Sequence, residues 1–221
     1  LWRPFSDMFD LGFGFCMSKS SPVTPSNTWK PPKSPYNLIQ EQLYEDPWKI
    51  LVACIFCNLT RRNTAEPLIW EYFEKYPCLE LAYHSLKLKK SAPTTLNAAN
   101  EVAVDAFLKI KTSDLKTALI SVKGIGDETA DDIILYAARR PVFVIDKFTK
   151  RILSRYGLTP TRNSYRSWQE FLHRNIEEDT LKFQRFHAFL VMLAQQSCKT
   201  KPQCSTCVLK ERCFTGCKVL L

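Results

Sequence analysis

The apolar residues of this chain recur with the spacing of α-helices and not with that of strands. From Tyr36 onward they fall three or four positions apart, and apolar and polar residues almost never alternate. A helical period begins after Tyr36, and the connections between helices are short. The further expected helices span 47–59, 65–76, 96–111, 114–120, 129–139, 146–156, 165–175 and 180–196. The pattern predicts an all-α fold.

The helix expected at 47–59 has a well-marked start and an unusually apolar body. Asp46 is a favourable N-cap, and Pro47 suits the first turn because its φ is already helical. The following residues, WKILVACIFCNL, are apolar nearly all round. Such a helix is expected to be buried in the core. In the next helix we expect Ile69, Trp70 and Phe73 to share one face.

Residues 1–34 lack any sustained hydrophobic period. They are rich in Ser, Pro, Asn and Lys, which favours a flexible arm. No apolar run approaches the ~20 residues that a membrane span needs, so no membrane partner is expected. We also expect no signal peptide, because the apolar run at 11–17 is short and Arg3 is a weak positive flank.

The charge of the chain favours a polyanionic partner. It carries 31 Lys and Arg against 22 Asp and Glu, a net charge of +9. A surplus of this size fits nucleic acid, although solubility alone could explain it. Nine cysteines without an export signal indicate a reducing compartment and a metal centre rather than a disulfide framework.

Four of these cysteines lie in a short basic stretch near the C-terminus. Cys198, Cys204, Cys207 and Cys213 form the run C-KTKPQ-C-ST-C-VLKER-C. Thiolates are soft donors, so four of them suit either a [4Fe–4S] cluster or a zinc ion. A pair of structural disulfides is the alternative, and the missing export signal argues against it.

A glycine hairpin is expected between two helices at 119–138. Its turn is Lys123-Gly124-Ile125-Gly126, and a helix is expected to start at Asp127 or Glu128. The two glycines let the backbone turn tightly and approach a surface, while Ile125 plugs into the core. Exposed amides at the start of the next helix would form an anion site suited to a DNA phosphate. Taken alone, the G-I-G motif is equally consistent with an ordinary helix connection.

An apolar run, PVFVI, then delivers Asp146 to the start of a helix. By itself an Asp at this place is most simply an N-cap. However, the hairpin KGIGDETAD, the segment VIDKFTKRI and the four-cysteine loop follow one another in this order. In this order they resemble the endonuclease III family of helix–hairpin–helix DNA glycosylases, over residues 110–217. One departure is that the first cysteine gap has five residues where the family usually has six.

This resemblance implies a two-lobed, all-α glycosylase fold with a C-terminal cluster loop, in which a [4Fe–4S] cluster is favoured over zinc. It implies a monomer that acts on double-stranded DNA, in the nucleus or nucleoid. Asp146 matches the catalytic aspartate. Glu128 stands where bifunctional members carry a Schiff-base lysine, so the chain is expected to be monofunctional, with Lys123 and Lys147 as nearby lysines that could change this. The expected DNA-binding residues are Lys123, Gly124, Ile125, Gly126, Lys147, Lys150 and Arg151.

Two earlier segments resemble other proteins. Residues 29–77 are similar to the thymine glycosylase domain that follows a methyl-CpG-binding domain. In that resemblance Asn58 matches the polar residue that fills the space left by a flipped base, and Leu59 stands where that branch has an arginine wedge. Residues 77–109, which contain the segment LNAANEVAV, resemble part of deoxyxylulose-phosphate reductoisomerase. The chain therefore reads as a mosaic.

The expected organisation is an arm at 1–34, a helical glycosylase domain at 35–197 and a cluster loop at 198–217. The expected function is excision of a damaged or mismatched base, with T or U opposite G favoured. The alternatives are a 3-methyladenine glycosylase, a bifunctional glycosylase and lyase, and a DNA-binding module without chemistry.

Overall fold

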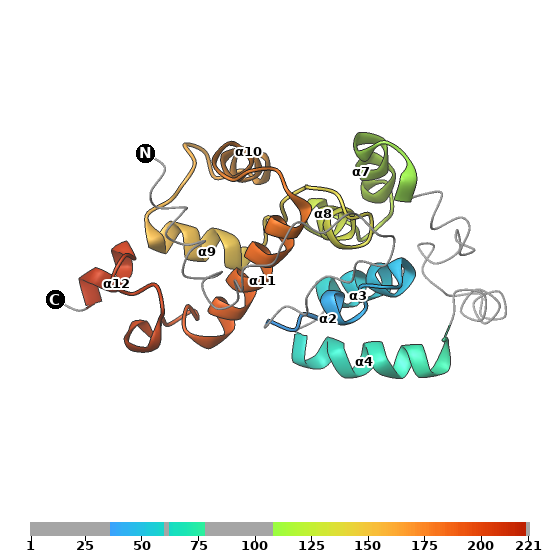
Figure 1. Cartoon of the computed structure of the whole chain (residues 1–221), viewed down its shortest axis with the longest axis horizontal. Coiled ribbons are helices and arrows are strands. Elements are labelled where there is room, and N and C mark those ends of the chain that lie inside the picture. The colour runs from blue at the N-terminus through green and yellow to red at the C-terminus, as the bar shows by residue number, and fades with distance from the viewer. Residues whose placement is uncertain (1–35, 60–61, 78–107, 220–221) are drawn as a thin grey trace, which may run out of the picture. The chain divides into compact units, whose positions relative to one another are not determined.

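The structure is a computed structural model, and it describes residues 36–59, 62–77 and 108–219. Every regular element in these ranges is a helix, which confirms the all-α prediction (Figure 1). Most of the helix expected at 96–111, and of the reductoisomerase-like segment, lies outside the described residues. None of the described helices is both long enough and apolar enough to cross a membrane. The helices are α2 (Ile39–Gln42), α3 (Pro47–Leu59), α4 (Arg62–Lys75), α7 (Thr112–Ile120), α8 (Asp127–Tyr136), α9 (Lys147–Tyr156), α10 (Tyr165–Asn175), α11 (Thr180–Gln196), the 3-10 helix η2 (Cys204–Thr206) and α12 (Phe214–Val219).

The described residues form two compact units. The front unit comprises residues 37–144, and the rear unit comprises Tyr36 together with 145–219. The front unit therefore carries α2 to α8, and the rear unit carries α9 to α12.

The front unit is built around α3. This helix packs against α4 and α8, and α7 packs on α8. Ile50 and Ala53 are fully buried, as the all-round apolar sequence predicts. The helix starts as expected, because the Asp46 carboxylate accepts a hydrogen bond from the Lys49 N–H at 3.1 Å.

The second helix of the front unit differs from expectation in one residue. On α4, Ile69 and Phe73 are buried, but the Trp70 side chain is 41% exposed. Ile69 and Phe73 are four residues apart and share a face, whereas Trp70 lies 100° further round the helix from Ile69. The three residues therefore do not form one buried face.

The rear unit is organised around α9 and α11, which pack against each other, with α12 also on α9. Both ends of α9 have capping groups. Asp146 is its N-cap, and Gly157 ends it with a φ of 104°, a left-handed conformation that favours glycine. On α11, Phe183, Phe186 and Leu190 are buried and supply much of the core.

Candidate active site, hairpin and cysteine loop

Asp146 is a buried carboxylate at the first turn of α9. Its Oδ1 accepts a hydrogen bond from the Thr149 N–H at 2.6 Å, and the residue is only 7% exposed. The structure therefore confirms the N-cap geometry that the sequence allows. An N-cap uses one carboxylate oxygen and leaves the other, Oδ2, to a different partner.

An ionisable neighbour of Oδ2 is His187 of α11. Its Nε2 lies 3.9 Å from Asp146 Oδ2, and both side chains are buried. This distance is longer than a hydrogen bond, and the two groups form an ion pair only when the imidazole is protonated. His187 could not be singled out from the sequence, because a lone histidine in an apolar helix resembles any core residue. The feature that could have identified His187 is its spacing from Gln184. The two residues are three positions apart and place polar groups on a buried helical face.

The backbone just before Asp146 is held by α10. The Ile145 N–H donates a hydrogen bond to the Tyr165 hydroxyl at 3.3 Å. The Lys150 ammonium lies 5.9 Å from the centre of the same Tyr165 ring, within the range of a cation–π contact. Three helices of the rear unit thus fix the position of the Asp146 carboxylate: α9, α10 and α11.

The glycine hairpin lies in the front unit, between α7 and α8. Gly124 has a φ of 96°, which only glycine adopts readily, and Ile125 is buried as expected. The Ile125 N–H closes the turn on the Val122 carbonyl at 3.0 Å. No described residue accepts a hydrogen bond from the N–H of Gly124 or Gly126. A methyl group added at either glycine would meet no protein atom within 4 Å. The hairpin therefore presents an open backbone surface.

The N-terminus of α8 also lacks a side-chain cap. Its N-cap is Gly126, whereas α9, α10 and α11 start at Asp146, Ser164 and Asp179, each of which accepts a backbone N–H. The start of α8 is thus a potential anion site. Asp127, in its first turn, is paired with Lys116 at 3.3 Å, which reduces the negative charge there.

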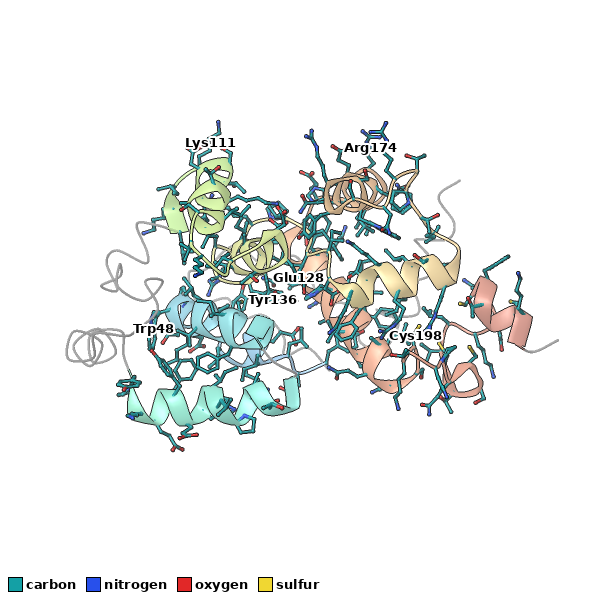
Figure 2. The ribbon with its side chains drawn as sticks, turned by 180° about the vertical axis from the view of Figure 1, so that it is seen from behind. Trp48, Lys111, Glu128, Tyr136, Arg174 and Cys198 are labelled. Carbon is teal, nitrogen blue, oxygen red and sulfur yellow. The ribbon has the colours of Figure 1, made fainter. Side chains whose placement is uncertain are left out.

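Glu128 is exposed in the first turn of α8, two residues after Gly126, and is labelled in Figure 2. Glu128 therefore places an exposed carboxylate at the start of α8. Lys123, in the hairpin, is exposed as well. Asn58 and Leu59 are the last two residues of α3, and their side chains lie outside the described part of the structure.

The basic residues of α9 fall into two groups. Lys147 is exposed and Lys150 is half-buried. The Arg151 guanidinium instead donates from Nε to the Cys198 carbonyl at 2.9 Å. Arg155 donates to the carbonyls of Lys199 at 2.6 Å and Thr200 at 2.8 Å. The arginines of this helix hold the start of the cysteine loop.

The four cysteines of the loop line a single cavity. Cys198, labelled in Figure 2, follows α11 and shares the cavity with Cys204, Cys207 and Cys213. The cavity is small, with a volume of about 20 Å³, and it opens to solvent. Burial raises the pKa of the Cys207 thiol, and the charges of the other three cysteines raise it further. A cation in the cavity would reverse that effect, because it stabilises thiolates.

The donor set therefore fits a thiolate-bound metal centre. Four soft donors face one space, which is what a four-iron cluster requires at its corners. Within the described ranges, no three His, Cys, Asp or Glu side chains are close enough to hold a single metal ion. The fit rests on the shared cavity and on the type of donor.

The loop ends in α12, a short helix that the sequence analysis did not predict. Gly216 of α12 lies so close to the Lys210 backbone that a methyl group there would collide with the Lys210 carbonyl. The Thr215 hydroxyl and the Cys213 thiol both donate to the Arg155 carbonyl, at 3.0 and 3.2 Å. Residues after the last cavity cysteine thus close the loop against α9.

Comparison with known proteins finds DNA glycosylases among the sequence relatives and the endonuclease III fold among the solved structures. A protein of Methanocaldococcus jannaschii, named as a DNA repair glycosylase, is 37% identical over 101 residues, which cover 46% of this chain and 46% of that protein. The chain thus spans about half the length of this relative. Endonuclease III, solved as a trapped covalent intermediate with DNA, superposes with a TM-score of 0.60 over 80% of this chain and 87% of that chain, at 18% identity. The chain therefore has the endonuclease III fold, and endonuclease III-like DNA glycosylases are its homologues and structural neighbours.

Two shorter matches fit a mosaic sequence. A methyl-CpG-binding domain protein 4-like protein of Arabidopsis thaliana is 46% identical over 50 residues, 23% of this chain and 11% of that protein. The family model of the DXP reductoisomerase C-terminal domain matches residues 70–130, less than half of the chain.

Proposed function

We propose that this chain is a DNA glycosylase that hydrolyses the bond between a damaged or mismatched base and its sugar. The observation that carries the proposal is the buried Asp146 carboxylate, fixed at the first turn of α9 by the Thr149 N–H. A carboxylate at this position can stabilise the positive charge that develops on the sugar as the base leaves. It can also orient or deprotonate the attacking water.

The hairpin supplies the contact with the DNA backbone. The uncapped start of α8 and the open amides of Gly124 and Gly126 are suited to a phosphate group. Lys123, Lys147 and Lys150 add accessible positive charge, while Arg151 serves the cysteine loop as well. Asn58 and Leu59 would fill the space that a flipped base leaves in the duplex.

The chain is proposed to be monofunctional. An imine with the opened sugar requires an amine, and Glu128 offers a carboxylate where a lysine would stand. Hydrolysis by Asp146 and water then leaves an abasic site in an intact strand.

A [4Fe–4S] cluster held by Cys198, Cys204, Cys207 and Cys213 is proposed as a structural group. When bound it supplies no chemistry to the hydrolysis and stabilises the fold of the loop. Three exposed basic residues between these cysteines then form a second edge for phosphates: Lys199, Lys201 and Arg212. Zinc is the alternative occupant.

The favoured substrate is T or U opposite G, because residues 29–77 resemble a thymine glycosylase domain. The test uses labelled duplexes with G·T, G·U, 3-methyladenine or thymine glycol, each analysed with and without hot alkali. Breaks that appear only after alkali support a monofunctional glycosylase, and the duplex that breaks names the substrate. Breaks without alkali would contradict the monofunctional assignment. Salt-dependent binding with no break on any duplex would favour a DNA-binding module.

A further inference from the structure

We infer that His187 is a positioning residue for the Asp146 carboxylate, and that its Nε2–H orients Oδ2 toward the reacting sugar. The inference rests on the proposed function and extends it to a residue on α11. It starts from the 3.9 Å separation between His187 Nε2 and Asp146 Oδ2, with both side chains buried.

The Asp146 carboxylate needs a second donor. A carboxylate removed from water favours its neutral form unless donors or positive charge compensate for the lost hydration. The Thr149 N–H satisfies Oδ1, and it is a single neutral donor. Asp146 must carry its negative charge to stabilise a cationic sugar. A donor at Oδ2 would therefore help the carboxylate to stabilise the cationic sugar.

His187 is held in place to be this donor. It is 5% exposed, and its neighbours Phe186 and Ala188 are buried with it on α11. Because α11 packs against α9, the ring has little freedom to leave the carboxylate. The 3.9 Å separation is longer than a hydrogen bond, and catalytic hydrogen bonds are often long before the substrate binds. A small shift of the ring or of the carboxylate would shorten this separation to hydrogen-bond length.

A purely structural link between α9 and α11 predicts different results from those of a positioning role. A structural link would affect stability in any variant that loses the contact. A positioning role requires only a donor at the place of Nε2. His187→Gln keeps an amide N–H near that place, His187→Asn moves it toward the place of Nδ1, and His187→Phe keeps the ring without a donor.

The experiment compares binding to two duplexes that contain no base at the reacting position. One carries a cationic pyrrolidine in place of the sugar, and the other carries a neutral tetrahydrofuran. An ionised Asp146 should make the wild-type chain bind the pyrrolidine duplex at least about tenfold more tightly. His187→Gln is expected to keep this ratio, while His187→Asn and His187→Phe reduce it to less than about threefold, with tetrahydrofuran binding unchanged. His173→Phe, a change of the same kind on α10, is the control and keeps the wild-type ratio.

Each result decides the question. A wild-type ratio in His187→Phe, or an equal loss in His187→Gln and His187→Asn, would overturn the role of His187. If His187→Phe fails to fold, the comparison of Gln with Asn decides alone. A wild-type chain that binds both duplexes equally would contradict the proposed glycosylase function, and with it this inference. The binding ratio does not depend on which base the chain removes, so the two failures are distinguishable.

Discussion

The Arg155 guanidinium, on α9, donates a hydrogen bond to the Thr200 carbonyl at 2.8 Å, across 45 residues of sequence. The same side chain reaches the Lys199 carbonyl at 2.6 Å and the Cys198 sulfur at 3.4 Å. A single residue of the helix that Asp146 caps thus holds the first segment of the cysteine loop.

The first prediction concerns this attachment. Arg155→Met removes donors from three acceptors of the loop, and since the contacts are partly exposed the expected loss is roughly 1–2 kcal/mol. Thermal unfolding should show a melting temperature lower by a few degrees, with reduced metal content. Arg174→Met is the control, because Arg174 is highly exposed and lies 4.0 Å from Glu170. Equal melting temperatures for the two variants would show that Arg155 does not hold the loop.

The second prediction separates the two hairpin glycines. Gly124→Ala forces a residue with a Cβ into a φ of 96° and should cost about 1 kcal/mol or more. Gly126 has a φ of −100°, so Gly126→Ala should cost less than about 1 kcal/mol. A methyl group at Gly126 meets no protein atom, but it would meet a phosphate bound at the start of α8.

Gly126→Ala should therefore weaken duplex binding by about tenfold while unfolding remains nearly unchanged. Binding is measured by fluorescence anisotropy at fixed salt, and stability by urea titration. Unchanged affinity in this variant would exclude the hairpin as the phosphate contact.

The third prediction identifies the metal centre. Purified protein should contain about four iron atoms and inorganic sulfide per chain. Cys204→Ser should abolish both, while Cys217→Ser leaves them unchanged, because Cys217 lies outside the cavity and its thiol donates to the Glu211 carbonyl. Gly216→Ala should reduce them, since its methyl group collides with the Lys210 carbonyl. A content of one zinc and no iron in the wild-type protein would show that the site holds zinc and not a cluster.

The fourth prediction concerns alkaline pH. Burial in the core of the front unit raises the pKa of the Cys54 thiol well above 9.0, and Asp132 raises it further. The unfolded chain loses this proton near its ordinary pKa, while the folded chain keeps it. The contribution of Cys54 to stability is thus complete below about pH 9 and is lost as the pH rises above it, by about 1.4 kcal/mol per pH unit at most. Urea unfolding at about pH 8 and pH 10 should show a smaller decrease in Cys54→Ala than in the wild type, and equal decreases would contradict this.

The helices could be predicted from local sequence because their ends carry local signals. Asp46 and Asp146 cap the helices that follow them, as their positions indicate. Gly157 ends α9 because its left-handed φ excludes most other residues. α12 could not be predicted because it has only six residues and no apolar period. It is held instead by contacts with Arg155 and Lys210.

The site could be predicted only in part because its partners are distant in sequence. Asp146 was recognisable from the motif around it. His187 lies 41 residues later, between apolar residues of a helix, and no motif marks it. Arg151 resembled a DNA ligand, and its contact with Cys198, 47 residues away, depends on how α9 and the loop fold together. The prediction that Arg151 binds DNA remains to be tested.

The central claim is that the Asp146 carboxylate performs the excision. The decisive measurement is single-turnover excision by the wild-type chain and by Asp146→Asn, on whichever duplex the wild type cleaves after alkali. Asn keeps an oxygen that can cap α9 but cannot carry the charge. The rate should fall by about 10³-fold or more, while duplex affinity remains within about threefold. Excision by Asp146→Asn at a rate near that of the wild type would contradict the account.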